Sequence, residues 1–255
     1  MTNQVKSVKL PVGLAPLVSR VEEICKNAER YRGTEIVKPP HLLLALDAGE
    51  GRTTAASYIA RAYQANRVRS FSGLERMLEY ELDGTMAGVR AMLTDVQANA
   101  VYANHFAGVL AIDPAALAAH LPEAQTALFL RKLPELGRDA TLVLFVPVEQ
   151  SRNLAQLTQK IRSALPDLEA IGFSAYTERE LAEITGRVLE NDGVELAPEG
   201  LDEALLQAVR NARGKTAKDA ERLARTLAQR AALSAGATSF GAAAFGTAQK
   251  KEAGV

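Results

Sequence analysis

Apolar residues along the chain gather in five short runs, separated by stretches in which apolar and polar positions alternate with helical spacing. The runs are HLLLAL, RVRSF, GVLAID, TLVLFVP and EAIGF, at residues 41–46, 67–71, 108–113, 141–147 and 169–173. Short continuous apolar runs are typical of strands buried on both faces, and strands that alternate with helices form parallel sheets. The pattern predicts an α/β fold in which helices cover both faces of a mostly parallel five-stranded sheet.

Helical spacing dominates the two ends of the chain. Residues 13–32 place apolar side chains on one face, which predicts an N-terminal helix that packs on the following domain. Thr177 and Glu180 form a capping box, and Pro198 suits the first turn of a helix. Three helical patterns at 177–192, 198–213 and 216–234 predict a small all-helical domain. The predicted parts are an N-terminal helical segment over 1–37, a three-layer αβα domain over 38–175, the helical domain over 176–235 and a flexible tail over 236–255.

The segment from His41 to Tyr63 has the layout of a phosphate-binding loop: a buried strand, a glycine-containing turn and a helix that starts at Thr53. A working P-loop reads G-x-x-x-x-G-K-[ST], in which backbone N–H groups hold the phosphates, the Lys reaches the β and γ oxygens, and the hydroxyl binds magnesium. Here Leu46 replaces the first Gly and Arg52 replaces the Lys. The matching positions that remain are Gly49, Glu50, Gly51, Thr53 and Thr54. The turn predicts a nucleotide-binding loop with altered chemistry, and an ordinary strand-to-helix turn is the alternative.

Asp113 ends the apolar run GVLAID, about sixty residues after the loop, where P-loop proteins hold the carboxylate that positions magnesium. The following DPAALAAH is also a good helix start, with Asp113 as the N-cap and Pro114 at the first helical position. The two interpretations are compatible in one residue. Thr53 and Asp113 are therefore the predicted magnesium ligands.

The charge balance excludes a general electrostatic attraction to nucleic acid or to an anionic membrane, because 30 basic and 30 acidic residues give a formal net charge of zero. A single cysteine, Cys25, excludes an internal disulfide, and the scattered His41, His105 and His120 provide no zinc spacing. Structural roles are expected for all four. No apolar run approaches the about 18 residues of a membrane span, and the N-terminus has no signal-peptide core. The chain is expected to be cytoplasmic.

Taken in order, several short phrases resemble AAA+ proteins of the CbxX/CfxQ kind, the group that includes the red-type rubisco activases. The resemblance covers roughly residues 36 to 232. The phrases are KPPHLLL before the loop, G-x-G-x-T-T within it, GVL-x-ID, LVLFVP, IRSALP, AYTERELAEI and NAR. This resemblance implies a P-loop AAA+ domain followed by a helical lid, with ATP or ADP and magnesium as the cofactors.

The resemblance also implies that the family's working residues are altered. Arg52 stands in place of the loop Lys, and its planar, bulkier guanidinium cannot simply take the Lys position. Pro114 follows Asp113 where the family has a Glu that polarises water. The arginine-finger segment keeps Arg162 but has Ala164 where a second Arg is expected. The lid arginine that senses the γ-phosphate corresponds to Arg213, with Lys218 and Arg222 as alternatives, and the aromatic-Gly pattern of the pore segment is absent from residues 71–90.

Two hypotheses follow. In the first, the chain is a pseudo-ATPase that binds nucleotide weakly or not at all and serves as a structural or regulatory subunit, with other AAA+ subunits as its partners in a homo- or hetero-oligomer. In the second, it is a slow magnesium-dependent ATPase that remodels a protein partner, with Glu149 as the base. A nucleic-acid role is a weaker third interpretation, which rests on the arginines of the helical domain, Arg210, Arg213, Arg222, Arg225 and Arg230.

Overall fold

The structure is a computed structural model that describes residues 9–30, 38–68, 75–100, 106–196, 201–212, 214–235 and 239–240. Contacts divide the chain into two compact units. The first comprises Met1–Ala48 and Arg52–Phe173, and the second comprises Gly49–Gly51 and Ser174–Val255. Each unit has a hydrophobic core of its own. None of the helices in the described part of the chain combines the length and the apolarity that crossing a membrane requires.

The first unit is built on a five-stranded sheet with the order β2-β3-β4-β1-β5, in which every neighbouring pair is parallel. The strands are β1 (His41–Ala45), β2 (Met77–Glu81), β3 (Val109–Asp113), β4 (Thr141–Val146) and β5 (Leu168–Gly172). The inner strands β1, β3 and β4 are buried along nearly their whole length, which explains their continuous apolar sequences. The predicted parallel five-stranded sheet is confirmed.

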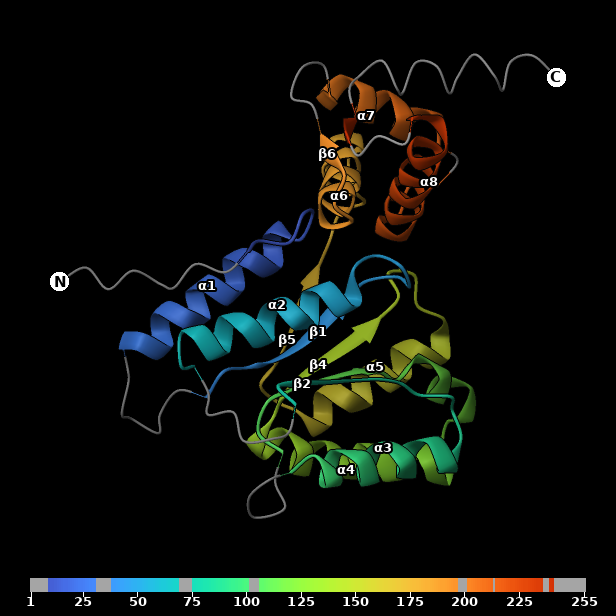
Figure 1. Cartoon of the computed structure of the whole chain (residues 1–255). Helices are drawn as coiled ribbons and strands as arrows, with labels where there is room; N and C mark the ends of the chain where they lie inside the picture. Colours follow the sequence, from blue (N-terminus) through green and yellow to red (C-terminus); the bar gives the residue numbers. More distant parts are fainter. Residues whose placement is uncertain are drawn as a thin grey trace. The chain divides into compact units, whose positions relative to one another are not determined.

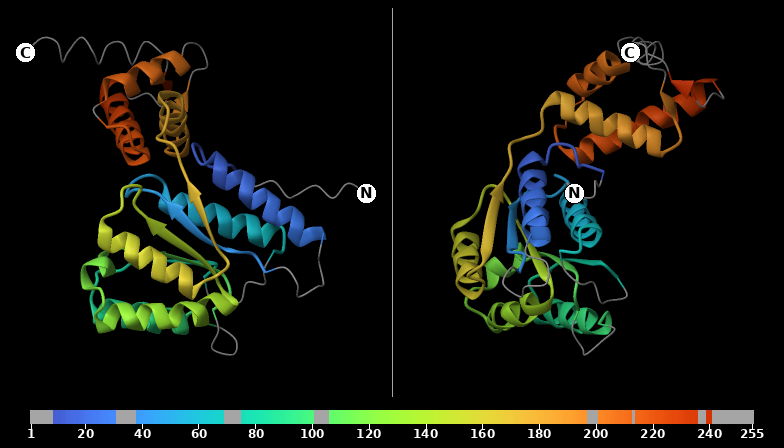
Figure 2. Two further views of the ribbon diagram at one scale, coloured as in Figure 1. Left: turned by 180° about the vertical axis from the view of Figure 1, so that it is seen from behind. Right: turned by 90° about the vertical axis from the view of Figure 1, so that its left-hand side faces the viewer.

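Helices cover both faces of this sheet (Figures 1 and 2). Helices α1 (Ala15–Arg30) and α2 (Arg52–Ala65) pack on one face against side chains such as Leu42, Leu44 and Phe145. The opposite face packs against α3 (Met86–Ala98), α4 (Ala124–Asp139), α5 (Arg152–Ala164) and a 3₁₀ helix (Ala115–His120). Successive side chains of one strand enter opposite cores, as Leu43 and Leu44 do. The three-layer αβα prediction is confirmed.

One predicted strand was wrong. The run 67–71 begins in the turn after α2, where the Val68 N–H donates to the Tyr63 carbonyl and Arg67 has a φ of 53°. Residues 69–71 lie outside the described residues. The corresponding strand of the sheet is β2, ten residues later than the predicted start, with the sequence MLEYE. This strand lies at an edge, and its exposed Glu79 and Glu81 interrupt the apolar signal.

The packing of α1 buries the single cysteine. Leu17, Val21, Ile24 and Cys25 are all buried on one face of the helix, as its spacing predicted. Cys25 is 1% exposed, and its thiol contacts the carbonyl oxygen of Ala62 at 3.9 Å. Burial, with a smaller contribution from Glu22, raises the pKa of this thiol to about 11.

Because the thiolate is the reactive form of cysteine, we expect Cys25 to resist iodoacetamide in the folded chain at about pH 8. Mass spectrometry after timed quenching measures the modified fraction, and the chain unfolded in urea serves as the fully reactive control. Rapid modification of the folded chain would contradict the packing of α1 on the sheet.

The second unit contains α6 (Glu178–Asn191), α7 (Leu201–Asn211) and α8 (Ala217–Ala235) around a core that includes Leu189 and Ala224. The predicted capping box is present, since Thr177 and Glu180 exchange side-chain and backbone hydrogen bonds. Pro198 lies outside the described residues. The predicted helical region after the sheet is confirmed, and the structure adds one short strand pair, in which β6 (Glu195–Leu196) lies parallel to β7 (Ser239–Phe240). Two-residue strands are too short to produce an alternating pattern. Apart from this strand, the predicted flexible tail lies outside the described residues.

Candidate functional site

The loop between β1 and α2 uses glycine where its backbone requires it. Gly49 has a φ of 89° and Gly51 a φ of 84°, in the left-handed region that glycine adopts without steric cost. Contacts assign Gly49–Gly51 to the second unit. Within that unit, the Lys218 N–H donates to the Gly49 carbonyl at 3.0 Å, and the Tyr176 hydroxyl donates to the Glu50 carbonyl at 3.0 Å. The backbone conformation of the loop therefore requires glycine at both positions.

Arg52, the first residue of α2, extends its side chain over the carboxyl end of the sheet. Its Nε donates to the carbonyl oxygen of Leu46 at 2.8 Å, and its Nη1 forms an ion pair with Oδ2 of Asp113. The guanidinium also lies 5.7 Å from the ring centroid of Phe145. Because β4 lies between β1 and β3, Arg52 starts after β1, passes over Phe145 of β4 and ends at Asp113 of β3.

Both members of this ion pair are largely withdrawn from solvent. The side chain of Arg52 is 15% exposed and that of Asp113 is 14% exposed. Charge-assisted hydrogen bonds and a cation over an aromatic face are both stronger where water is excluded. The replacement of Lys by Arg therefore creates a set of contacts that joins three strands through one side chain.

The carboxylate of Asp113 uses both oxygens. While Oδ2 meets Arg52, Oδ1 accepts the N–H of Ala115 at 2.8 Å. This second bond lies at the start of the 3₁₀ helix, where Pro114 occupies the N-cap position without a side-chain cap. The predicted α-helical start at Asp113 thus becomes a local turn followed by a 3₁₀ helix. The magnesium-positioning role of Asp113 stays a prediction. In this structure its Oδ2 is already paired with the guanidinium of Arg52.

The second residue of α2 meets another acid. The hydroxyl of Thr53 donates to Oε1 of Glu79 at 3.0 Å, while Thr54 is exposed. Glu79 belongs to β2, the strand next to β3. Sequence reasoning missed this residue because it placed the strand at 67–71. The alternation in MLEYE, which puts Glu79 and Glu81 on one face, was the signal that could have identified it.

The remaining predicted site residues belong to other elements of the two units. Glu149 is exposed just after β4, at the carboxyl ends of the strands, where Asp113 also lies. Arg162 is exposed in the last turn of α5. This turn leads to the start of β5, so Arg162 lies near the amino ends of the strands. Arg213 lies outside the described residues. Of the alternatives to it in α8, Lys218 is exposed and Arg222 forms an ion pair with Asp219 at 3.3 Å.

His41 and His120, the two histidines that the structure describes, have different surroundings. His41 is buried, and its Nδ1 accepts the N–H of Leu142 at 3.1 Å, a structural contact between β1 and β4. His120 lies 3.6 Å from a carboxylate oxygen of Glu123, and His105 is outside the described residues. Where the structure describes the chain, no group of three or more His, Cys, Asp or Glu side chains is placed to hold a metal ion.

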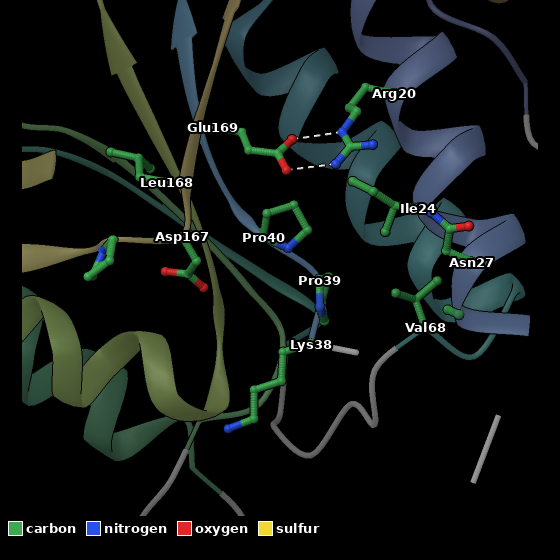
Figure 3. Close-up of a pocket in the computed structure, with 12 residues that line it drawn as sticks. Arg20, Ile24, Asn27, Lys38, Pro39, Pro40, Val68, Asp167, Leu168 and Glu169 are labelled. Atoms are coloured by element: carbon green, nitrogen blue, oxygen red, sulfur yellow. Dashed lines mark hydrogen bonds and ion pairs between the residues drawn. The ribbon is translucent and has the colours of Figure 1, made fainter. Parts of the chain in front are cut away.

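A separate hollow of about 380 Å³ lies at the amino-terminal edge of the sheet (Figure 3). Its walls come mainly from α1, from the residues that precede β1 and from the residues at the start of β5. Across it, Arg20 of α1 makes two hydrogen bonds of 2.7 and 2.6 Å to the carboxylate of Glu169 in β5. This paired contact stabilises the position of α1 on the sheet, and it is remote from the Arg52 contacts at the carboxyl edge.

Comparisons with known proteins identify the fold. No protein-family model and no curated protein sequence matches the chain. Among solved structures, the RuvB Holliday junction branch migration motor of Thermotoga maritima matches with a TM-score of 0.63 and 21% identity, over 94% of this chain and 69% of RuvB. PCH-2 of C. elegans matches with a TM-score of 0.55 and 13% identity, over 92% of this chain and 67% of PCH-2. These likenesses and the sheet order show that the chain has the AAA+ fold.

Proposed function

We propose that this chain is a pseudo-ATPase of the AAA+ fold, a subunit that acts through its surfaces rather than through nucleotide turnover. The observation that carries the proposal is the ion pair between Arg52 and Asp113, with the guanidinium also bonded to Leu46 and placed over Phe145. The acid expected to position magnesium is thus neutralised by the chain's own cation. The residue expected to reach the phosphates is turned toward protein atoms.

The affinity of this arrangement for magnesium is expected to be low. Mg²⁺ is held in such sites by one or two carboxylates together with the phosphates of the nucleotide. To bind here it would have to displace a partly buried guanidinium that makes an ion pair and a carbonyl hydrogen bond, both of which would be lost. Nucleotide binding is therefore expected to be weak or absent.

Hydrolysis has a second obstacle in Pro114. A general base must reach the attacking water, and the position after Asp113 carries a buried proline with neither an acid nor a backbone donor. The finger segment retains only Arg162, since Ala164 replaces its companion. A finger arginine is worth about 10³ to 10⁵ in rate where it operates, so the loss of a companion compounds the missing base.

The proposed role is that of a structural or regulatory subunit in an assembly with other AAA+ chains, of the CbxX/CfxQ kind or another. Arg162 is exposed near the amino ends of the strands, whereas Asp113 lies at their carboxyl ends. Such a residue cannot serve the site of its own unit, but it is available to a neighbouring subunit. A chain without turnover can support an active partner in this way.

The test is phosphate release by the purified chain with ATP and magnesium, with Asp113→Asn as the matched control. We expect no magnesium-dependent release above the control, because the base is missing and Asp113 is already paired. Turnover that requires magnesium and disappears in Asp113→Asn would overturn the proposal.

That same outcome would support the alternative function, a slow magnesium-dependent ATPase. The observations in its favour are the positive φ angles of Gly49 and Gly51, which a P-loop turn also uses, and the exposed Thr54 in the first turn of α2. It would require Arg52 to leave Asp113 and contact phosphate, Thr53 and Asp113 to hold magnesium, and Glu149 to act as the base. A Glu149→Gln variant would then lose turnover while keeping nucleotide binding.

A further inference from the structure

We infer that Glu79 is a second residue that opposes nucleotide binding at this site, through the negative charge that it holds beside Thr53. The inference rests on the proposed function and assigns a role to a residue of β2. It is carried by the juxtaposition of the first two residues of α2 with two neighbouring strands. Arg52 pairs with Asp113 at the end of β3, and the Thr53 hydroxyl donates to Glu79 of β2 at 3.0 Å.

The sheet register places these contacts together. In the parallel pairing of β2 with β3, Glu79 lies opposite Ala111 and Glu81 lies opposite Asp113. Side chains two positions apart on a strand point to the same face, so Glu79, Glu81 and Asp113 all belong to the face that α2 covers. The first turn of α2 therefore meets carboxylates from two strands at its N-terminal end.

This end of a helix is the part that binds phosphate in P-loop proteins. The first N–H groups of a helix lack partners within the helix, and the helix dipole favours an anion beside them. Glu79 brings a fixed negative charge to this position through its bond to Thr53. A phosphate group that approached the same turn would meet that charge, and like charges at short range repel.

Glu79 also fixes the orientation of the hydroxyl that a working loop offers to magnesium. With its proton donated to Glu79, the Thr53 hydroxyl is oriented toward β2. The two residues predicted as magnesium ligands, Thr53 and Asp113, are thus both held by side chains of the chain itself. A hydroxyl that donates its proton keeps its lone pairs for a metal, so the feature that opposes nucleotide is the negative charge of Glu79 beside the phosphate position.

The experiment compares three variants of the full chain by isothermal titration with MgADP: Arg52→Lys, Arg52→Lys/Glu79→Gln and Arg52→Lys/Glu81→Gln. The Lys restores the residue of a working loop, and each Gln removes one negative charge from the same face of the same strand. Glu81 is exposed like Glu79, so its variant controls for net charge. We expect Glu79→Gln to tighten MgADP binding about threefold over Arg52→Lys alone. Glu81→Gln should have a clearly smaller effect.

Because Glu79 is exposed, the gain from its removal should shrink as ionic strength rises. Circular dichroism confirms that each variant is folded, and Arg52→Gln replaces Arg52→Lys in the same comparison if the latter does not fold. Equal effects of Glu79→Gln and Glu81→Gln, or no MgADP binding by any variant, would overturn the inference. Those outcomes leave the proposed function standing, whereas magnesium-dependent phosphate release by the unmodified chain would overturn the proposed function instead.

Discussion

Replacing Arg52 with alanine is expected to lower the free energy of unfolding of the first unit by about 2–3 kcal/mol. The change leaves Asp113 without its cation, and at 14% exposure that carboxylate recovers only part of its hydration. It also removes the hydrogen bond to Leu46 and the contact with Phe145. Truncating one partner of a buried ion pair lowers the free energy of unfolding more than truncating one partner of an exposed pair. The Arg52–Asp113 pair is partly buried, so the expected loss lies between these two cases. Urea unfolding followed by circular dichroism measures the loss.

A double-mutant cycle separates the ion pair from the other contacts of Arg52. Asp113→Asn removes the negative charge while an amide oxygen can still accept the N–H of Ala115. If the pair is the main contribution, Arg52→Ala should cost much less in the Asp113→Asn background than in the unmodified chain. Equal costs in the two backgrounds would show that Arg52 and Asp113 do not interact in solution.

Phe145→Ala is expected to have the largest effect on stability, a loss of about 3–5 kcal/mol. Phe145 is 1% exposed and belongs to β4, the central strand between β3 and β1. Its ring packs in the core beneath α2, and the guanidinium of Arg52 lies above it. Truncation therefore leaves a cavity at the centre of the sheet and removes the aromatic support for the ion pair.

The matched control for this change is Phe145→Leu, which fills most of the space but has no aromatic face. Its cost should be about 1–2 kcal/mol, the sum of imperfect packing and the lost cation–π contact. In the Arg52→Ala background the aromatic part should vanish, so Phe145→Leu should then cost less. A loss below 1 kcal/mol for Phe145→Ala would contradict the placement of this ring in the core.

The sheet could be predicted from the sequence where burial alone dictated the residues. Both faces of β1, β3 and β4 are covered, so each has to be apolar throughout, and Leu42 to Leu44 show this directly. The edge strand β2 has one face partly open to water and carries Glu79 and Glu81, so a search for apolar runs passed over it. The two-residue strands β6 and β7 have no periodicity to detect.

The members of the site could be predicted one by one, but their contacts could not. Arg52 and Asp113 each stood out as a departure from, or a match to, a P-loop pattern. Their pairing joins residues 61 positions apart and depends on the strand order, which places β4 between the two strands that carry them. A residue pattern along the chain does not determine that order. The position of Glu79 could not be predicted, because it depends on the register of β2 against β3.

The thermal unfolding of the unmodified chain with MgADP or MgATP in excess over the protein, compared with magnesium alone, tests the central claim most directly. A ligand that binds only the folded state at 100 times its dissociation constant adds about 2.7 kcal/mol of stability, which a melting curve resolves easily. The account predicts superimposable curves, because Arg52 is already paired with Asp113 and bonded to the carbonyl oxygen of Leu46. A rise in melting temperature that is already saturated when either nucleotide is only slightly in excess over the protein would show tight binding and would contradict it.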